Sequence, residues 1–319
     1  MTFIRSLTSA VALTVLLFAG ASHAADKVLL GTVGSGGALS WPLYVGLAKG
    51  TFAKQGIDVE LISAPSSAAV QQQVAAGSVN IGTGGFVDPI RAIDKGAPMK
   101  ILRVEAKAAP YVVFAKPSIK SYGELKGKTI MVGGAKDITR IYLERMLTPN
   151  GVKPGEYDLV YAGATAARFA SLQSGAVDAT IITSPFNFKA ESAGFTKLGV
   201  TTDYVNDFPF AGYSVNTQWA KSHPQQVHAF LKGYADAMAW LVDPKNRSEA
   251  VEILIKNTGA VSDDAAKSYD FFKEIDLYDV AGSVPKSGLA KLLVVMKDLG
   301  ELEGPADISR FYDPAFVTD

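Results

Sequence analysis

Hydroxyl-bearing residues and glycines follow short apolar segments of this chain at six places, and each place opens a run with helical character. Their hydroxyls and free backbone N–H groups suit a small polar or anionic solute. Arg140 and Arg168 stand near the start of two such runs, where a guanidinium could bind a carboxylate or a sulfonate. Aromatic side chains near the loops could wall the apolar part of a ligand. The predicted ligand-binding residues are Ser35, Gly36, Trp41, Ser66, Ser67, Thr83, Gly84, Phe86, Lys136, Asp137, Thr139, Arg140, Thr165, Arg168, Thr183, Ser184 and Phe186.

Each of these residues also has an alternative role that involves no ligand. Serine and threonine at these places are good helix caps, because their oxygens accept from the free N–H groups of the first turn. Arg140 and Arg168 could be solvated surface residues, and Trp41 and Phe86 could pack beneath a sheet. Asp88, which precedes a proline, is expected to cap a helix rather than to touch a ligand.

Motifs for catalysis and for nucleotide binding are incomplete. The glycine-rich segment 31–37 lacks the next glycine of a dinucleotide fingerprint counted from Gly34, because Leu39 occupies that position. The same segment lacks the Lys-Ser/Thr pair of a phosphate-binding loop. The chain has no cysteine, and His223 and His228 match no metal-ligand motif. We therefore predict that the protein is not an enzyme and holds no metal ion or cofactor.

The loops belong to two similar runs of strand, loop and helix. Gly77 and Gly175, which end corresponding helices, are 98 residues apart, and Gly96 and Gly194 share this offset. Short strands that alternate with helices predict an α/β fold with mainly parallel sheets. In such folds ligands bind at the carboxyl ends of the strands. We therefore predict two lobes, each a mainly parallel sheet flanked by helices, with a ligand cleft between them.

Three further segments indicate where the chain passes between the lobes. Strands are predicted over 101–106 and 111–115 at the first crossing and over 209–215 at the second. The tail from Ser222 is predicted to be helical, because apolar residues recur there at helical spacing, and to pack on the first lobe. The predicted lobes are 25–110 plus 212–319 for the first and 111–211 for the second.

The first 24 residues have the pattern of a secretory signal peptide. Arg5 precedes an apolar run over 7–21, and the small residues Ser22 and Ala24 flank His23 at the expected cleavage site. An uncleaved anchor is the alternative, although the run is shorter than the roughly 20 residues of a stable span. The net charge of zero argues against nucleic acid or an anionic membrane as a partner. We predict an exported, monomeric protein of the periplasm.

The order and spacing of several segments carry a family resemblance. They are Trp41-Pro42-Leu43-Tyr44-Val45, 48–52, 56–59, 75–82, 125–130 and 174–179. With these segments the chain resembles the periplasmic solute-binding proteins of nitrate, sulfonate and taurine ABC importers, which are related to thiamine-pyrimidine synthases. The resemblance implies a type II-like bilobal fold that closes on its ligand and delivers it to a membrane permease. It also implies ligand contacts from Ser35 to Trp41, from Thr83 to Phe86 and from Gly134 to Thr139.

Departures from the family pattern affect the expected ligand. Relatives often have an acidic residue at the position of Ser184, and its absence disfavours an amine at that place. Relatives often have glycine and serine where Lys136 and Asp137 stand. The synthase members use cysteine and histidine chemistry that this chain lacks. A small anionic organic solute, such as a sulfonate, a taurine-like compound or a carboxylate, is therefore expected. A receptor for a membrane sensor, a binder of a neutral heterocycle such as a thiamine pyrimidine precursor, and a secreted enzyme are the alternatives.

Overall fold

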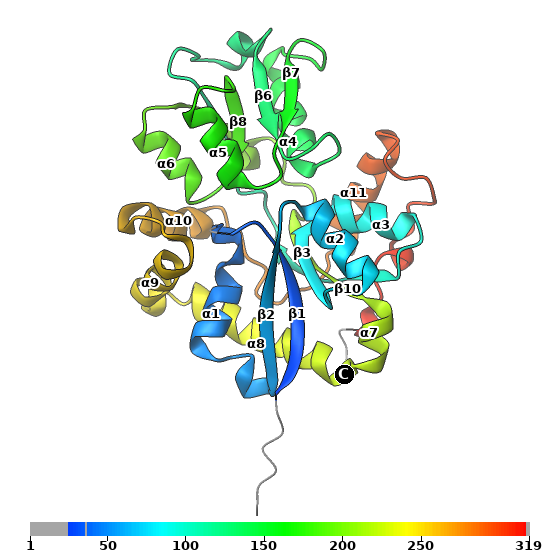
Figure 1. The fold of residues 1–319 in the computed structure, drawn as a ribbon. Coiled ribbons are helices and arrows are strands. Elements are labelled where there is room, and N and C mark those ends of the chain that lie inside the picture. The colour runs from blue at the N-terminus through cyan, green and yellow to red at the C-terminus, as the bar shows by residue number, and fades with distance from the viewer. Residues whose placement is uncertain (1–24, 36, 317–319) are drawn as a thin grey trace, which may run out of the picture.

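Two five-stranded sheets organise the chain, which a computed structural model describes over residues 25–35 and 37–316 (Figure 1). The predicted signal peptide 1–24 and Gly36 lie outside the described residues. In spatial order the first sheet contains β2 (Ile57–Ala64), β1 (Asp26–Val33), β3 (Ile81–Gly85), β10 (Ala211–Asn216) and β4 (Met99–Ala106). The second contains β7 (Asp158–Tyr161), β6 (Thr129–Val132), β8 (Ala179–Ile182), β5 (Val112–Ala115) and β9 (Thr196–Val200).

The second sheet repeats the layout of the first. Strand β1 lies between β2 and β3 and is parallel to both, as β6 is to β7 and β8. The fourth strand of each sheet is antiparallel to both neighbours. These strands, β10 and β5, are the ones that follow the two crossings, and each enters its sheet from the opposite direction. The sheets are therefore mixed, and the predicted parallel pairing holds for three strands of each.

Helices follow the parallel strands in both lobes, as the sequence repeat predicts. In the first lobe they are α1 (Trp41–Lys49), α2 (Ser67–Ala76) and α3 (Val87–Asp94), and in the second α4 (Ile138–Leu147), α5 (Thr165–Gln173) and α6 (Phe186–Ser192). Gly77 and Gly175 have φ angles of 74° and 78°, and both end helices in the left-handed conformation that favours glycine. The matching glycines therefore reflect matching turns. Strand β9 was not predicted from the sequence.

The described part of the tail contains five further α-helices: α7 (Thr217–Ser222), α8 (Pro224–Val242), α9 (Arg247–Thr258), α10 (Ser262–Glu274) and α11 (Lys286–Asp298). Helix α8 packs against α1 of the first lobe, and the ring of Phe230 on α8 stacks at 5.7 Å on that of Phe52, which follows α1 in the chain. Ser222 is the last residue of α7, and the N-cap of the long helix α8 is His223. None of the helices among the described residues is long and apolar enough to cross a membrane.

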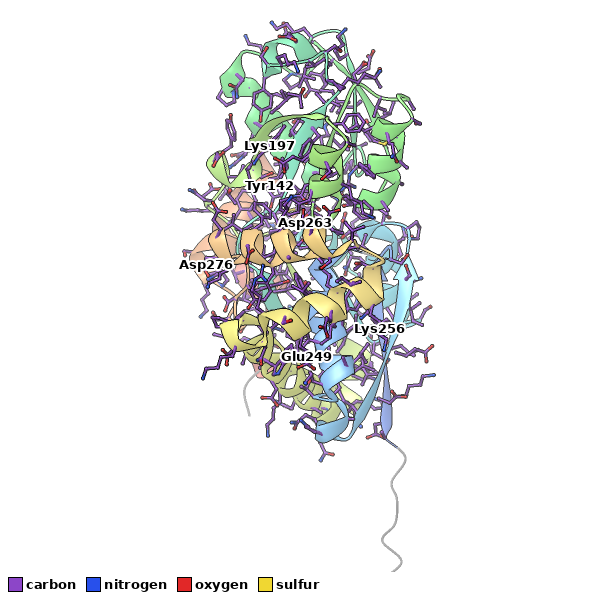
Figure 2. All side chains as sticks on the ribbon, turned by 90° about the vertical axis from the view of Figure 1, so that its left-hand side faces the viewer. Tyr142, Lys197, Glu249, Lys256, Asp263 and Asp276 are labelled. Carbon is purple, nitrogen blue, oxygen red and sulfur yellow. The ribbon has the colours of Figure 1, made fainter. Side chains whose placement is uncertain are left out.

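The tail also reaches the second lobe. Figure 2 shows α9, which carries Glu249 and Lys256, beside the first lobe, with α10 nearer to the second. The rings of Phe188 on α6 and Phe271 on α10 meet edge to face at 6.1 Å. The tail helices therefore contribute to the boundary between the lobes as well as to the first lobe.

Candidate functional site

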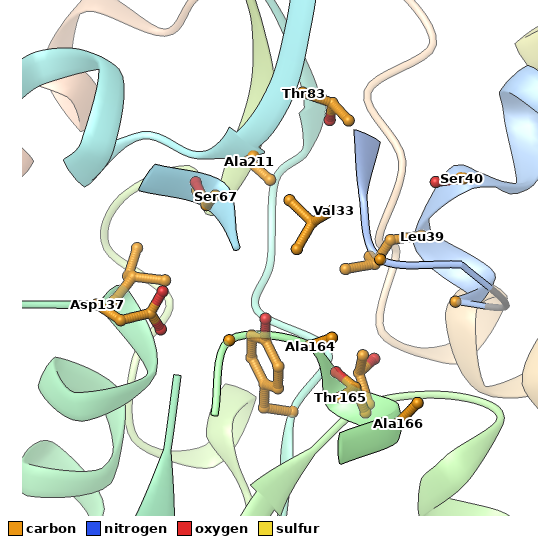
Figure 3. A pocket seen from close by; sticks show the side chains of 18 of the residues that line it. Val33, Leu39, Ser40, Ser67, Thr83, Asp137, Ala164, Thr165, Ala166 and Ala211 are labelled. Carbon is orange, nitrogen blue, oxygen red and sulfur yellow. The ribbon is translucent and has the colours of Figure 1, made fainter. Parts of the chain in front are cut away.

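A cavity lies where the carboxyl ends of the parallel strands of the two sheets face each other. Its volume is about 840 Å³ when the solvent-filled space at its mouth is included. Figure 3 shows Ser67 and Thr83 of the first lobe on one side of it and Thr165 of the second lobe on the other. Ligands of open α/β sheets bind at this edge, because loops and helix N-termini converge there. The cavity is therefore the candidate ligand site.

The structure brings about half of the predicted ligand-binding residues into the cavity wall. Those that line it are Ser35, Ser67, Thr83, Gly84, Asp137, Thr165, Arg168, Thr183 and Phe186. Those that the structure places elsewhere are Trp41, Ser66, Phe86, Lys136, Thr139, Arg140 and Ser184. Gly36 lies outside the described residues.

Trp41 and Phe86 pack into the first lobe instead of walling the cavity. The Trp41 indole donates to the Ala250 carbonyl at 2.9 Å, and its ring meets the Tyr269 ring edge to face at 5.8 Å. Phe86 is buried, and a Cβ built on Gly212 would lie 2.6 Å from its Cζ. Both rings stand at the start of helices, and both helices turn these positions toward the core.

The remaining predicted residues outside the wall hold the loops in shape. The Ser66 hydroxyl accepts from Ala69 N–H at 3.2 Å and caps α2, and the Thr139 hydroxyl accepts from Gly133 N–H at 2.8 Å. Ser184 is buried, and its carbonyl accepts from Ala38 N–H of the other lobe at 3.1 Å. The Lys136 ammonium lies 3.6 Å from Glu301. Ser66 thus has the capping role that the sequence left open, whereas Thr139 holds the loop before α4 and Ser184 links the two lobes.

The two arginines have different surroundings. Arg140 pairs with Glu144, four residues further along α4, at 2.7 Å and donates to the Ala135 carbonyl at 2.8 Å. Arg168 is 1% exposed and lies in the first turn of α5. No described carboxylate lies within ion-pair distance of it. A buried guanidinium without an anionic partner is costly, so the positive charge of Arg168 is available to a ligand.

Backbone groups hold the Arg168 side chain in place. Its Nε donates to the Ile181 carbonyl at 2.8 Å, and its Nη1 donates to the carbonyls of Ala162 and Gly163 at 3.1 and 2.6 Å. Its Nη2 donates to the Thr165 hydroxyl at 3.0 Å. Four of its five N–H groups are thereby used. The arginine thus fixes the loop before α5 and places a positive charge beside the cavity.

The start of α5 adds to this positive pole. Its N-cap, Ala164, has no side chain that could satisfy the free N–H groups of the first turn. Thr183, also in the wall, is 2% exposed, and its hydroxyl has no partner in the described part of the chain. A helix N-terminus, a buried guanidinium and an unpartnered hydroxyl together suit an anionic group.

Glu105 and Tyr111 line the cavity, although sequence reasoning missed both. Glu105 lies near the end of β4, is 2% exposed and accepts hydrogen bonds from the hydroxyls of Tyr213, Tyr234 and Thr83 at 3.0, 2.6 and 3.3 Å. Burial raises its pKa, and these hydroxyls oppose the shift. The sequence signal was Glu105 together with Arg103 in a predicted strand whose other residues are apolar, because a buried charge needs a partner or a function.

Loops of the two lobes touch around the cavity. A Cβ built on Gly163, after β7, would lie 2.5 Å from the Pro65 carbonyl oxygen and 2.6 Å from the Ser66 Cβ, after β2. Arg91 on α3 donates to the Lys136 carbonyl of the second lobe and forms ion pairs with Asp88 and Glu301, each at 2.9 Å. The lobes are therefore in contact on more than one side of the cavity.

Asp88 lies at this boundary between the lobes, and its pKa is higher than that of an ordinary aspartate. Burial raises its pKa to about 6, and the Asp137 carboxylate of the other lobe acts in the same direction. The Ser67 hydroxyl and Arg91 act in the opposite direction. The Oδ1 atom accepts from Arg91, whereas Oδ2 is buried and has no partner among the described residues. Ionisation of Asp88 is thus disfavoured in the folded protein.

Replacing Asp88 with asparagine should flatten the pH dependence of stability. Between about pH 4 and pH 6 the folded wild type keeps a proton on Asp88 that the unfolded chain releases, so its free energy of unfolding falls as the pH rises. This group alone accounts for at most about 3 kcal/mol of that fall. Urea unfolding of both proteins at a series of pH values would measure how the free energy of unfolding changes with pH. Identical pH profiles for Asp88→Asn and the wild type would contradict the assignment.

The sequence model of the family described as NMT1/THI5 like matches residues 39–247, which is more than half of the chain. The chain belongs to this family. This NMT1/THI5-like protein is 23% identical over 220 residues to the 4-amino-5-hydroxymethyl-2-methylpyrimidine phosphate synthase THI13 of Saccharomyces cerevisiae. The match covers 64% of this chain and 64% of that relative.

Solved structures similar to this NMT1/THI5-like protein include two periplasmic binding proteins. One is the aliphatic sulphonate binding protein SsuA from Escherichia coli, with a TM-score of 0.71, 19% identity, and 90% of this chain and 92% of that chain covered. The other is the nitrate-binding protein NrtA from Synechocystis PCC 6803, with a TM-score of 0.64, 17% identity, and 75% and 68% covered. These similarities establish the fold. They confirm the two-lobed architecture predicted from the sequence, and the match of the family model confirms the family resemblance.

Proposed function

We propose that this protein is the periplasmic solute-binding component of an ABC importer and that it binds a small anionic organic solute, such as a sulfonate or a carboxylate. The observation that carries the proposal is Arg168, a buried guanidinium with no described carboxylate partner, in the wall of a cavity between two lobes. The acid group of the solute would bind between this guanidinium and the start of α5.

Binding would act through closure of the lobes. A solute that touches both walls stabilises the closed arrangement over an open one by its additional contacts. The contacts between the loops after β2 and β7 belong to the closed arrangement. The permease would recognise the closed form. We further propose that the lobes divide as 25–110 plus 212–319 and 111–211, and that residues 1–24 direct export.

A thermal-shift screen of residues 25–319 would test the proposal. The panel would hold alkanesulfonates, taurine, nitrate, short carboxylates and pyrimidines. A ligand at 100 times its Kd should stabilise the protein by about 2.7 kcal/mol. We expect stabilisation by sulfonates or carboxylates. Stabilisation by neutral pyrimidines alone would contradict the anionic solute.

An enzymatic role is the second candidate, because synthases occur among the family relatives. We propose binding rather than catalysis, since the chain has no cysteine and neither His223 nor His228 lines the cavity. Mass spectrometry of each stabilising compound after long incubation with the protein would decide between the two. Recovery of a converted product would favour the enzyme.

A further inference from the structure

Two acidic side chains line the same cavity, and an anionic solute alone makes no use of them. Glu105 comes from the first lobe and Asp137 from the second. An acid group placed at Arg168 would leave both carboxylates facing the rest of the ligand. Like charges repel, so a purely anionic ligand would be disfavoured by this wall. The two carboxylates therefore restrict the chemistry of the part of the ligand that does not bind Arg168.

Glu105 has room for one more hydrogen bond. Its Oε1 accepts from Tyr213 and Tyr234 at 3.0 and 2.6 Å, and its Oε2 accepts from Thr83 at 3.3 Å. A carboxylate offers about four acceptor positions, so one position on Oε2 is left. The nearby guanidinium of Arg103 does not pair with it, because it lies over the Tyr234 ring at 4.4 Å and donates to the carbonyls of Val104 and Asp279. Glu105 is thus a buried acceptor that forms no ion pair with the described residues, although the charge of Arg103 acts on it from nearby.

Asp137 uses one of its two oxygens for the protein. Its Oδ1 accepts from the backbone N–H and the hydroxyl of Thr139 and thereby caps α4. Its Oδ2 has no hydrogen-bond donor among the described residues. Capping accounts for one oxygen of this carboxylate and leaves the other for a ligand.

The acidic and basic groups lie within reach of one small molecule. Glu105, Asp137, Arg168 and Tyr111 line the same cavity, and the Tyr111 ring centre is 5.9 Å from the Arg168 Cζ. Burial raises the pKa of Tyr111 to about 12, and of the two charged groups Arg168 lowers it while Asp137 raises it. The Thr183 hydroxyl, which has no partner in the described parts of the chain, indicates a polar ligand near Arg168.

We propose that the ligand carries a protonated amine as well as an acid group, and that Glu105 and Asp137 bind the amine while Arg168 binds the acid. This inference rests on the proposed function and names its ligand class, small amino-substituted organic acids. An ammonium group donates three hydrogen bonds and would neutralise the carboxylates that the protein leaves unpaired. Relatives often have an acidic residue at the position of Ser184, where it could bind an amine. In this chain the carboxylates for the amine would come instead from β4 and from the loop before α4.

Matched pairs of acids test the proposal by isothermal titration calorimetry. The pairs are taurine with ethanesulfonate, β-alanine with propionate, and 4-aminobutyrate with butyrate, so that each pair differs by the amine alone. We expect at least one amino acid to bind about tenfold or more tightly than its partner, because a site built for a charged donor rejects the analogue that lacks it. Glu105→Gln and Asp137→Asn should each reduce this preference about tenfold.

The variants are chosen to preserve the fold. Glutamine has nearly the shape of glutamate and can still accept from the tyrosines, and asparagine caps a helix as well as aspartate does. Glu60→Gln, at an exposed ion pair on the edge strand β2, is the matched control and should leave the preference unchanged. Thermal unfolding of each variant would show that any change reflects binding.

The outcomes separate this inference from the function on which it rests. Equal or tighter binding of the acids without an amine would overturn the inference and leave the proposed function standing. A preference for the amine that survives in both variants would overturn the assignment of Glu105 and Asp137. Binding of no acid in the panel would overturn the proposed function together with the inference.

Discussion

Gly163→Ala is expected to weaken solute binding about thirtyfold while the protein stays folded. The added Cβ would lie 2.5 Å from the Pro65 carbonyl oxygen, which is backbone of the other lobe and cannot rotate away. Overpacking of this kind costs about 2 kcal/mol, and a cost confined to the closed form appears as lost affinity. Separation of the lobes relieves the clash, so the stability of each lobe should change little. Calorimetric titration with the acid that binds most tightly would measure the loss.

Gly123→Ala is the matched control for this substitution. Gly123 is exposed, and its nearest neighbour to a built Cβ is the Ser121 Oγ at 3.9 Å. Its replacement should change neither affinity nor stability by more than about 0.5 kcal/mol. Small-angle scattering of the free and bound forms would show whether Gly163→Ala favours the open arrangement. Unchanged affinity in this variant would contradict the view that solute binding requires contact between the two loops.

Arg168→Met is expected to lower the affinity for an organic acid about a hundredfold or more. Removing one partner of a buried charge pair costs about 3 kcal/mol or more, because the other charge is left without compensation. The variant should also lose about 2–4 kcal/mol of stability, since Ile181, Ala162 and Gly163 lose their hydrogen-bond donor. Affinity measured by calorimetry well below the unfolding temperature separates the two effects.

Arg140→Met provides the comparison. Arg140 also stands near the start of a helix after a strand, but it pairs with Glu144 and lies outside the cavity wall. Its replacement should change the affinity less than about twofold, because exposed i,i+4 pairs contribute about 0.5 kcal/mol. Arg168→Lys, which keeps the charge, covers the case in which the methionine variant does not fold. Wild-type affinity in a folded Arg168→Met protein would rule out this arginine as the anion site.

Much of the fold was predictable because its signals act over short distances. Helix ends depend on residues within one turn, and so Gly77 and Gly175 mark corresponding turns in both the sequence and the structure. Strands were predicted where apolar residues cluster, as over β8 (Ala179–Ile182). The short, half-buried strand β9 was missed because its pattern is weak and its pairing partner, β5, lies about 80 residues away along the chain. Recurrence of the pattern after 98 residues predicted the two lobes.

The identity of the site residues depended on the tertiary structure. Arg140 and Arg168 both stand near the start of a helix that follows a strand. The partner of Arg140, Glu144, is four residues away and can be read from the sequence, whereas the contact of Arg168 with the backbone of β8, which holds it at the cavity, cannot. Glu105 became a site residue through hydroxyls that are 22, 108 and 129 residues away. Side-chain direction and charge pairing depend on neighbours that folding brings together, and short-range patterns carry no information about those neighbours.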